Sequence, residues 1–179
     1  MLDKVILSVM GPHAGESEDF IFNRKVEEIK REGYTFWVHH SVSADPITVR
    51  SFIWGCNNPI ILFLAPSAKG GAKDTKSLNY ATKYSLDKIN WLEVPKDIKA
   101  SGVNKGAYAF VIKNIELNPL IKEVDLSKYT VSDWNEEPRF MQGRGSLCCK
   151  INNFPRVKTR IRKVVASAVL CNPYSVYLK

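Results

Sequence analysis

Two groups of side chains in the first quarter of the chain have the types needed for acid–base chemistry. They follow two apolar segments, at residues 4–10 and 34–40, and consist of His13, Glu16, Glu18 and Asp19, and of His39, His40 and Ser41. In an open parallel α/β sheet, the loops at the carboxyl ends of the strands bind the ligand. If the first three strands form such a sheet, these groups could supply a general acid and a general base. No spacing among them is specific to one reaction, so this hypothesis depends on topology.

A loop rich in Gly and Lys follows the most apolar segment of the chain. The loop reads SAKGGAKDT over residues 67–75, and its candidate phosphate ligands are Ser67, Lys69, Gly70, Gly71 and Lys73. Backbone N–H groups of a Gly-Gly pair with lysines beside them could hold a phosphate. The GxxxxGK[ST] spacing of a Walker A loop is absent, and Gly-Gly pairs flanked by Lys are also common in surface loops.

The whole chain of 179 residues carries a formal net charge of +8, and its basic residues are concentrated in the last part. No acidic residue follows Glu137. The candidate phosphate contacts in this part are Arg139, Arg144, Lys150, Arg156, Lys158, Arg160 and Arg162. A basic region of this kind is typical of a protein that binds a polyanion such as DNA or RNA, and the alternative is a solvated face that keeps the protein soluble.

Four tryptophans offer aromatic surfaces, although most tryptophans in a domain of this size pack in the core or at its rim. Trp134 lies close in the sequence to Arg139 and Arg144 and is suited to stacking on a base. Trp54 lies near the end of a predicted helix, beside a polar Gly-Cys-Asn-Asn segment, and is suited to a pocket wall.

The four cysteines, Cys56, Cys148, Cys149 and Cys171, form no CxxC pair and no metal-ligand spacing with the histidines. We therefore expect buried, reduced cysteines, no metal, no bound cofactor and a cytoplasmic protein. No segment approaches the roughly 20 apolar residues that span a bilayer, and the first apolar segment is too short for a signal peptide.

The apolar patterns predict a single domain over residues 1–179 that mixes strands and helices. We expect strands at 4–10, 34–40, 59–64, 90–95 and 107–115, a further short strand at 121–124, and a strand rather than a helix at 157–170. A helix is predicted from about Glu18 to Arg31, capped by Ser17 or Asp19, with an apolar stripe of Phe20, Ile21, Val26 and Ile29 and a stop at Gly33. A second helix is predicted at 47–55, after Asp45-Pro46.

The segment FWVHHSVSADPITVRSFIWGCNNPIILFL, residues 36–64, resembles the opening of the YTH and EVE modules of the PUA-like superfamily. In that family a strand is followed by a helix that ends near an Ile-Trp-Cys/Gly element, and then by an apolar strand. The resemblance implies a small mixed α/β barrel or curved sheet with flanking helices. It further implies that Trp54 is one wall of an aromatic cage around a base, with Trp91 standing in for a second wall.

Two function classes follow. The leading one is a nucleic-acid-binding module in which basic side chains hold phosphates and an aromatic pocket takes an unstacked base. The alternative is a Rossmann-like nucleotide-binding or nucleotide-processing enzyme whose site is built from residues 11–19, 39–45 and 67–75. A third possibility is an accessory protein whose basic face docks an acidic partner.

Overall fold

Ten strands and two α-helices form the part of the chain that the computed structural model describes, residues 2–13, 15–39, 44–66, 79–101, 107–131, 146–153 and 158–179. In chain order the elements are β1 (Lys4–Val9), α1 (Glu18–Glu32), β2 (Thr35–His39), α2 (Pro46–Ile53), β3 (Ile60–Leu64), β4 (Lys83–Ser85), β5 (Trp91–Glu93), β6 (Tyr108–Glu116), β7 (Glu123–Asp125), the short 3₁₀ helix η2 (Leu126–Lys128), β8 (Tyr129–Val131), β9 (Ser146–Ile151) and β10 (Ile161–Leu178). The strands belong to one sheet, which uses both ends of the chain and confirms a single domain of mixed α/β class.

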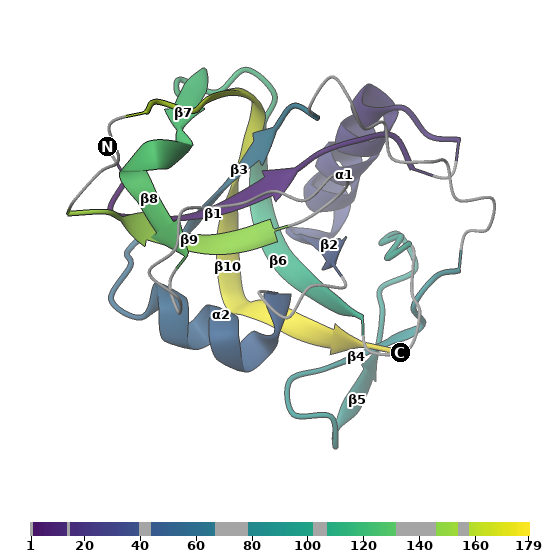
Figure 1. The fold of residues 1–179 in the computed structure, drawn as a ribbon. Helices are drawn as coiled ribbons and strands as arrows, with labels where there is room; N and C mark the ends of the chain where they lie inside the picture. Colours follow the sequence, from purple (N-terminus) through teal and green to yellow (C-terminus); the bar gives the residue numbers. More distant parts are fainter. Residues whose placement is uncertain are drawn as a thin grey trace.

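The sheet is mixed, and its main path has the strand order β2-β6-β10-β3-β1-β9-β8 (Figure 1). Among the described strands β1 and β3 are the one parallel pair, and the other pairings are antiparallel. Strand β2 therefore runs opposite to β1 and β3, and three other strands separate it from β1. The Rossmann-like sheet with its first three strands parallel is wrong, and the enzyme hypothesis that depended on it loses its structural basis.

Strand β10 connects most of the sheet. It pairs with β7 at its start, with β3 and β6 along its length, and with β4 at its end. The strand predicted at 157–170 is confirmed in type but begins and ends later, at Ile161 and Leu178. Its pairing with β3 and β6 shifts register at several points, and such irregularities bend a strand and increase its twist.

The bend brings side chains from distant strands together. The Oγ atom of Ser8 on β1 and the Nε2 atom of His39 on β2 lie 3.1 Å apart in a buried hydrogen bond. No hydrogen-bonded pairing joins the edge strands β2 and β8 among the described residues, so the sheet curls without closing.

The ends of both helices follow the expected signals. The Ser17 hydroxyl accepts a hydrogen bond from the Phe20 N–H at 3.2 Å, and α1 ends at Gly33, which has a φ of 81°. This φ suits glycine because it lies in the left-handed region. The Asp45 carboxylate caps α2 through the N–H groups of Ile47 and Thr48.

The predicted apolar stripe of α1 is wrong in part. Phe20 is 55% exposed, and the buried residues of α1 are Ile21, Phe22, Lys25 and Glu28. The helix therefore buries two charged residues on the side that packs against the sheet.

Three clusters of buried side chains form the core. The largest fills the space between the sheet and both helices and includes Phe22, Trp37 and Phe63. A second cluster packs η2 and β8 against β1 and β3, and a third packs residues 81–100 against β2, β6 and the end of β10.

Three of the strands are not predicted by the sequence. Strand β9 begins at Ser146, in a part of the chain for which no strand is predicted, and it pairs with β1 and β8. Strands β4 and β8 have three residues each. The strands predicted at 90–95 and 107–115 are confirmed as β5 and β6, and the one at 121–124 corresponds to β7 at 123–125.

The packing of Phe63 gives a direct test of the core. This ring is fully buried, with centroids 5.3 Å from Phe22 and 4.4 Å from Trp37. We expect Phe63→Ala to lower the free energy of unfolding by about 3–5 kcal/mol in urea denaturation, because a cavity replaces these contacts. The control Leu120→Ala removes a side chain that is 93% exposed and should change it by less than about 0.5 kcal/mol. Equal effects of the two substitutions would contradict this packing.

Candidate functional site

A pocket of about 190 Å³ lies where the end of β1, helix α1, strand β2 and the segment before β6 meet. Its apolar lining consists of Val9, Met10, Gly11, Ile21, Phe36, Trp37 and Val38. Its polar lining consists of His13, Arg24, Lys25, His39, Lys99 and Ser101. Because a cavity of about 150 Å³ is sufficient to bind benzene, this pocket can take a flat ring.

Trp37 is the largest aromatic side chain in the pocket lining. Its ring is stacked on Phe22 with centroids 5.4 Å apart, and it also packs on Phe63. Only 8% of Trp37 is exposed, so its position is fixed by the core. A rigid aromatic wall of this kind favours flat ligands.

His39 is held in place by its neighbours. Besides its hydrogen bond to Ser8, its ring meets the edge of Phe110 at a centroid distance of 5.7 Å. Ser8 is 1% exposed and does not line the pocket. The Ser8–His39 hydrogen bond therefore orients the imidazole and joins β1 to β2, and it does not present a serine to a ligand.

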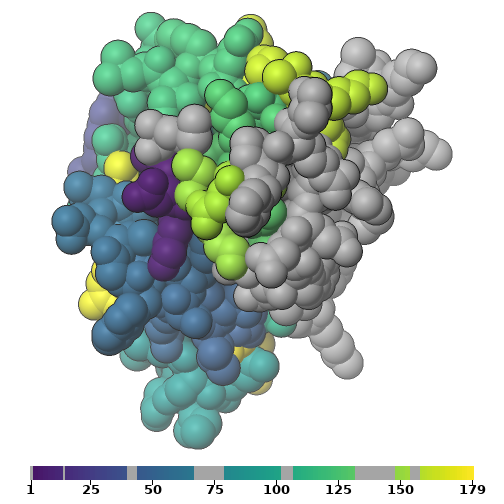
Figure 2. Space-filling view, turned by 60° about the vertical axis from the view of Figure 1, so that its left-hand side comes forward, coloured from purple at the N-terminus to yellow at the C-terminus, as the bar shows by residue number. Residues whose placement is uncertain are grey.

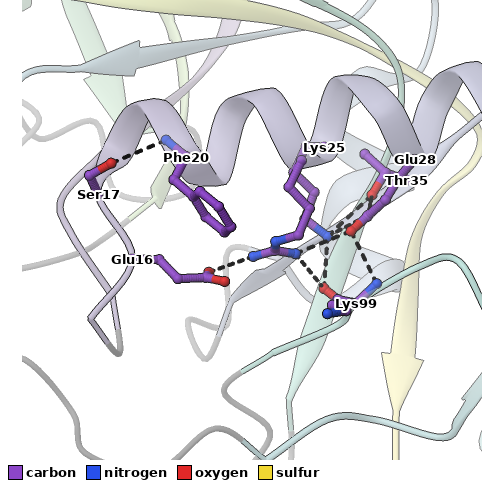
Figure 3. A network of polar contacts seen from close by, with 8 residues as sticks. Glu16, Ser17, Phe20, Lys25, Glu28, Thr35 and Lys99 are labelled. Atoms are coloured by element: carbon purple, nitrogen blue, oxygen red, sulfur yellow. Dashed lines mark hydrogen bonds and ion pairs between the residues drawn. The ribbon is translucent and has the colours of Figure 1, made fainter.

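A buried polar network lies between α1, the start of β2 and the segment around residue 99 (Figure 3). Glu28 Oε2 accepts hydrogen bonds from the Lys25 ammonium, at 2.8 Å, and from the Thr35 hydroxyl. Lys25 Nζ also donates to Thr35 Oγ1 at 3.2 Å and to the Lys99 carbonyl at 2.8 Å. Glu28 Oε1 accepts from the Lys99 backbone N–H at 3.2 Å. These hydrogen bonds hold α1, the start of β2 and the segment around residue 99 together beside the pocket.

The titration of Lys25 reflects its burial. Removal from water lowers its pKa from 10.5 to about 8, and the neighbouring Glu28 carboxylate opposes the shift. The three acceptors around its ammonium match the three protons that this group can donate.

Arg24 extends the network toward the N-terminus of α1. Its Nη2 donates to Glu16 Oε2 at 2.7 Å, and its Nη1 donates to Glu28 Oε1 at 3.1 Å and to the Lys99 carbonyl at 3.4 Å. Its Nε is buried and has no hydrogen-bond partner among the described residues. Leaving a buried donor unpaired costs about 1–3 kcal/mol, so this atom is a candidate ligand contact.

The charges in this network balance. Arg24 and Lys25 are each paired with carboxylates, from Glu16 and Glu28. Since two cations face two anions, this wall of the pocket favours an uncharged polar ligand over a phosphate group.

Part of the predicted acid–base group meets in this pocket. His13 and His39 line it, and Glu16 is paired with Arg24 beside it. Glu18 and Asp19 lie in the first turn of α1, where burial and the charge of Asp19 raise the pKa of Glu18. His40, Ser41 and the predicted phosphate loop of Ser67, Lys69, Gly70, Gly71 and Lys73 lie outside the described residues.

The described phosphate candidates come from two segments of the chain, β9 and the region around the start of β10. Lys150 is on β9, opposite Lys4 at the start of β1. Arg162 is at the start of β10, and Lys158 and Arg160 come just before this strand. Arg162 donates to the Ala65 carbonyl, and burial together with the positive charge of Arg160 lowers its pKa. Arg139, Arg144 and Arg156 lie outside the described residues.

Trp54 and Trp91, two of the three tryptophans expected to form a base pocket, do not line the pocket described here. Trp54 is 84% exposed at the end of α2. Trp91 is on β5, where its Nε1 donates to the Lys88 carbonyl and Lys179 lies over its ring. Trp134 lies outside the described residues, so base stacking by any of these three stays a prediction.

The residues that build the pocket wall do not stand out in the sequence. Trp37 is one of four tryptophans, and nothing in its immediate sequence distinguishes it from a core or rim residue. Lys25 and Glu28 fall on the same side of α1 as Ile21 and Phe22, and this spacing is the available signal for a buried charged pair.

Comparison with known proteins adds no relative: no family model, curated protein or solved structure matches this chain. The resemblance to YTH and EVE modules therefore stays a prediction. Neither of the two described helices combines the length and the apolar character needed to cross a membrane. Within the described ranges, no group of three or more His, Cys, Asp and Glu side chains is placed to hold a metal ion.

The buried network can be tested by matched substitutions on α1. Glu28→Gln leaves the buried Lys25 without a carboxylate and leaves Arg24 with Glu16 alone, and we expect the free energy of unfolding to fall by about 3–5 kcal/mol. Glu27→Gln removes a carboxylate from an exposed pair with Lys30 and should leave the urea midpoint unchanged. A Glu28→Gln midpoint equal to that of Glu27→Gln would show that the network contributes nothing to stability.

Proposed function

We propose that this protein binds nucleic acid, with phosphates held by basic side chains of its C-terminal part and one unstacked base held in the pocket between α1 and β2. The observation that supports this most directly is the position of the basic residues at the start of β10. They lie at the same end of the sheet as the pocket.

Backbone hydrogen bonds establish this proximity. The Met10 N–H donates to the Leu64 carbonyl at 2.9 Å, and the Ala65 N–H donates to the Lys163 carbonyl at 3.0 Å. Met10 lines the pocket, and Arg162 donates to Ala65. The end of β3 thus lies between the pocket and the basic start of β10.

Mutual repulsion between cations is a second argument. Arg160 and Arg162 are two residues apart in the chain, and the pKa of Arg162 is lowered first by burial and second by the positive charge of Arg160. A bound phosphate would relieve this repulsion, and release of counterions would add affinity that is independent of sequence.

Further lysines extend the basic surface. Lys128 and Lys150 are brought together by β8 and β9, where the Asn152 N–H donates to the Lys128 carbonyl at 2.8 Å. Figure 2 shows the segments around residues 120–131, 146–153 and 158–163 on one face of the molecule. Within the described part of the chain, no ion pair joins Lys128, Lys150 or Lys158 to a carboxylate.

The pocket supplies the second part of the proposal. Its aromatic and aliphatic walls suit a base, and Arg24 and Lys25 in its polar wall are already paired with carboxylates, so these two cations give a phosphate little advantage. Recognition of unstacked bases by apolar and aromatic pockets is common among proteins that bind single strands.

Two double variants of equal charge test the phosphate contacts. Lys158→Gln with Arg160→Gln should weaken binding to labelled single-stranded DNA and RNA of mixed sequence. The slope of log Kobs against log salt concentration should become shallower by about 1 for each cation that no longer meets a phosphate. The measurement is fluorescence anisotropy at several salt concentrations.

The matched control is Lys96→Gln with Lys113→Gln, which removes the same charge from two exposed lysines elsewhere. We expect it to bind as the wild type does. Equal weakening by the two double variants would show that only net charge matters, and no binding by the wild type at low salt would refute the proposal.

A further inference from the structure

The donor groups of Arg24 and Lys25 in the pocket wall differ in their remaining hydrogen-bonding capacity. The ammonium of Lys25 is surrounded by acceptors from Glu28, Thr35 and Lys99, as Figure 3 shows. The two terminal nitrogens of Arg24 are used by carboxylates and by the Lys99 carbonyl. The Nε–H of Arg24 is left without a protein acceptor in the described residues, although the atom is buried.

The position of this N–H group is fixed in advance. Arg24 is tied at Nη1 to Glu28 and at Nη2 to Glu16, and its side chain is 13% exposed. The guanidinium is planar, so two anchored nitrogens also determine the direction in which the third one points. A ligand acceptor that displaces the atoms now covering Nε would therefore gain a charge-assisted hydrogen bond without ordering the Arg24 side chain first.

The surroundings limit which acceptor can meet it. The opposite charges around Arg24 already balance, which disfavours a phosphate or carboxylate ligand. The lining around Trp37 and Val38 is apolar and suits a flat ring. An uncharged ring that carries an exocyclic carbonyl oxygen satisfies both conditions, because that oxygen is a strong acceptor in the plane of the ring.

We propose that Arg24 is a specificity-determining residue whose Nε–H donates to the carbonyl oxygen of a keto base. The pocket should then prefer keto bases such as hypoxanthine, guanine or uracil to rings that lack the carbonyl. The inference rests on the proposed function for the presence of a base, but it concerns the pocket alone and can be tested with free nucleosides.

Inosine and purine riboside form a suitable ligand pair because inosine carries a carbonyl at the position where purine riboside carries hydrogen. We expect the wild-type protein to bind inosine about tenfold more tightly in calorimetric titrations, the difference of one charge-assisted hydrogen bond. In ¹H–¹⁵N spectra the Arg24 Nε–H signal should move with inosine and stay in place with purine riboside. Equal affinities, an unmoved signal, or no binding of either nucleoside would overturn the inference.

Matched substitutions on one helix complete the test. Arg24→Lys keeps the positive charge but removes the Nε–H, and it should abolish the preference for inosine. Arg31→Lys is the same change at a side chain that is 63% exposed, and it should preserve the preference. If Arg24→Lys does not fold, the wild-type spectra alone decide the matter.

The measurements of oligonucleotide binding distinguish failure of this inference from failure of the proposed function. A wild-type protein that binds single strands in a salt-dependent way but shows no keto preference retains the proposed function and refutes the role of Arg24. A protein that discriminates between the nucleosides but binds no oligonucleotide retains the role of Arg24, and its ligand is a free nucleoside.

Discussion

The arrangement of this protein depends on the pairing of one long strand. Strand β10 has 18 residues and forms hydrogen bonds with β7, β3, β6 and β4 in turn. Register shifts along its pairings with β3 and β6 bend this strand. Because of the bend, β2 lies close to β1, and His39 forms a hydrogen bond with Ser8. The pocket exists because of this curl, since β1 and β2 are separated by three strands in the sheet and yet both contribute to its lining. A flat sheet with the same strand order would leave these residues far apart.

Much of the secondary structure could be predicted because its signals are local. The apolar runs that form β1, β3 and β6 and the caps at Ser17, Gly33 and Asp45 require information from a few neighbouring residues only. Strand order and direction could not be predicted in the same way. The reversed direction of β2 depends on its pairing with β6, about 70 residues later in the chain. Strand β9 could not be predicted because its own sequence, SLCCKI, has a weak strand pattern. The strand is stabilised by its pairing with β1 and β8.

The site was harder to predict than the fold, for an electrostatic reason. Lys25 and Glu28 lie on the buried side of α1, where the sequence pattern favours apolar residues. Their burial is tolerated because Thr35 and the backbone of Lys99 complete their hydrogen bonds. Those partners lie 10 and 74 residues from Lys25 in the chain, so no local pattern reveals them. The histidines of the pocket can be singled out from the sequence, but on the basis of a parallel topology that the sheet does not have.

The positive charges of Arg24 and Lys25 in the pocket wall are paired with carboxylates, whereas lysines of the basic surface have no such pairs in the described residues, and this difference affects recognition. Cations such as Lys158 and Arg160 would attract any polyanion, with an affinity that falls as salt is added. Arg24 and Lys25 in the pocket wall are already paired with carboxylates, so what they contribute to binding should depend on the shape and hydrogen-bonding groups of the ligand and only weakly on salt. Affinity and discrimination would then reside in different residues at the same end of the sheet. Because the end of β3 lies between them, Ala65 and Leu64 would set the distance between a phosphate on Arg162 and a base beside Met10 in the proposed complex. Strand pairing fixes the positions of these backbone segments, so the proposed spacing of base and phosphate would be a property of the sheet and would not require a loop to move.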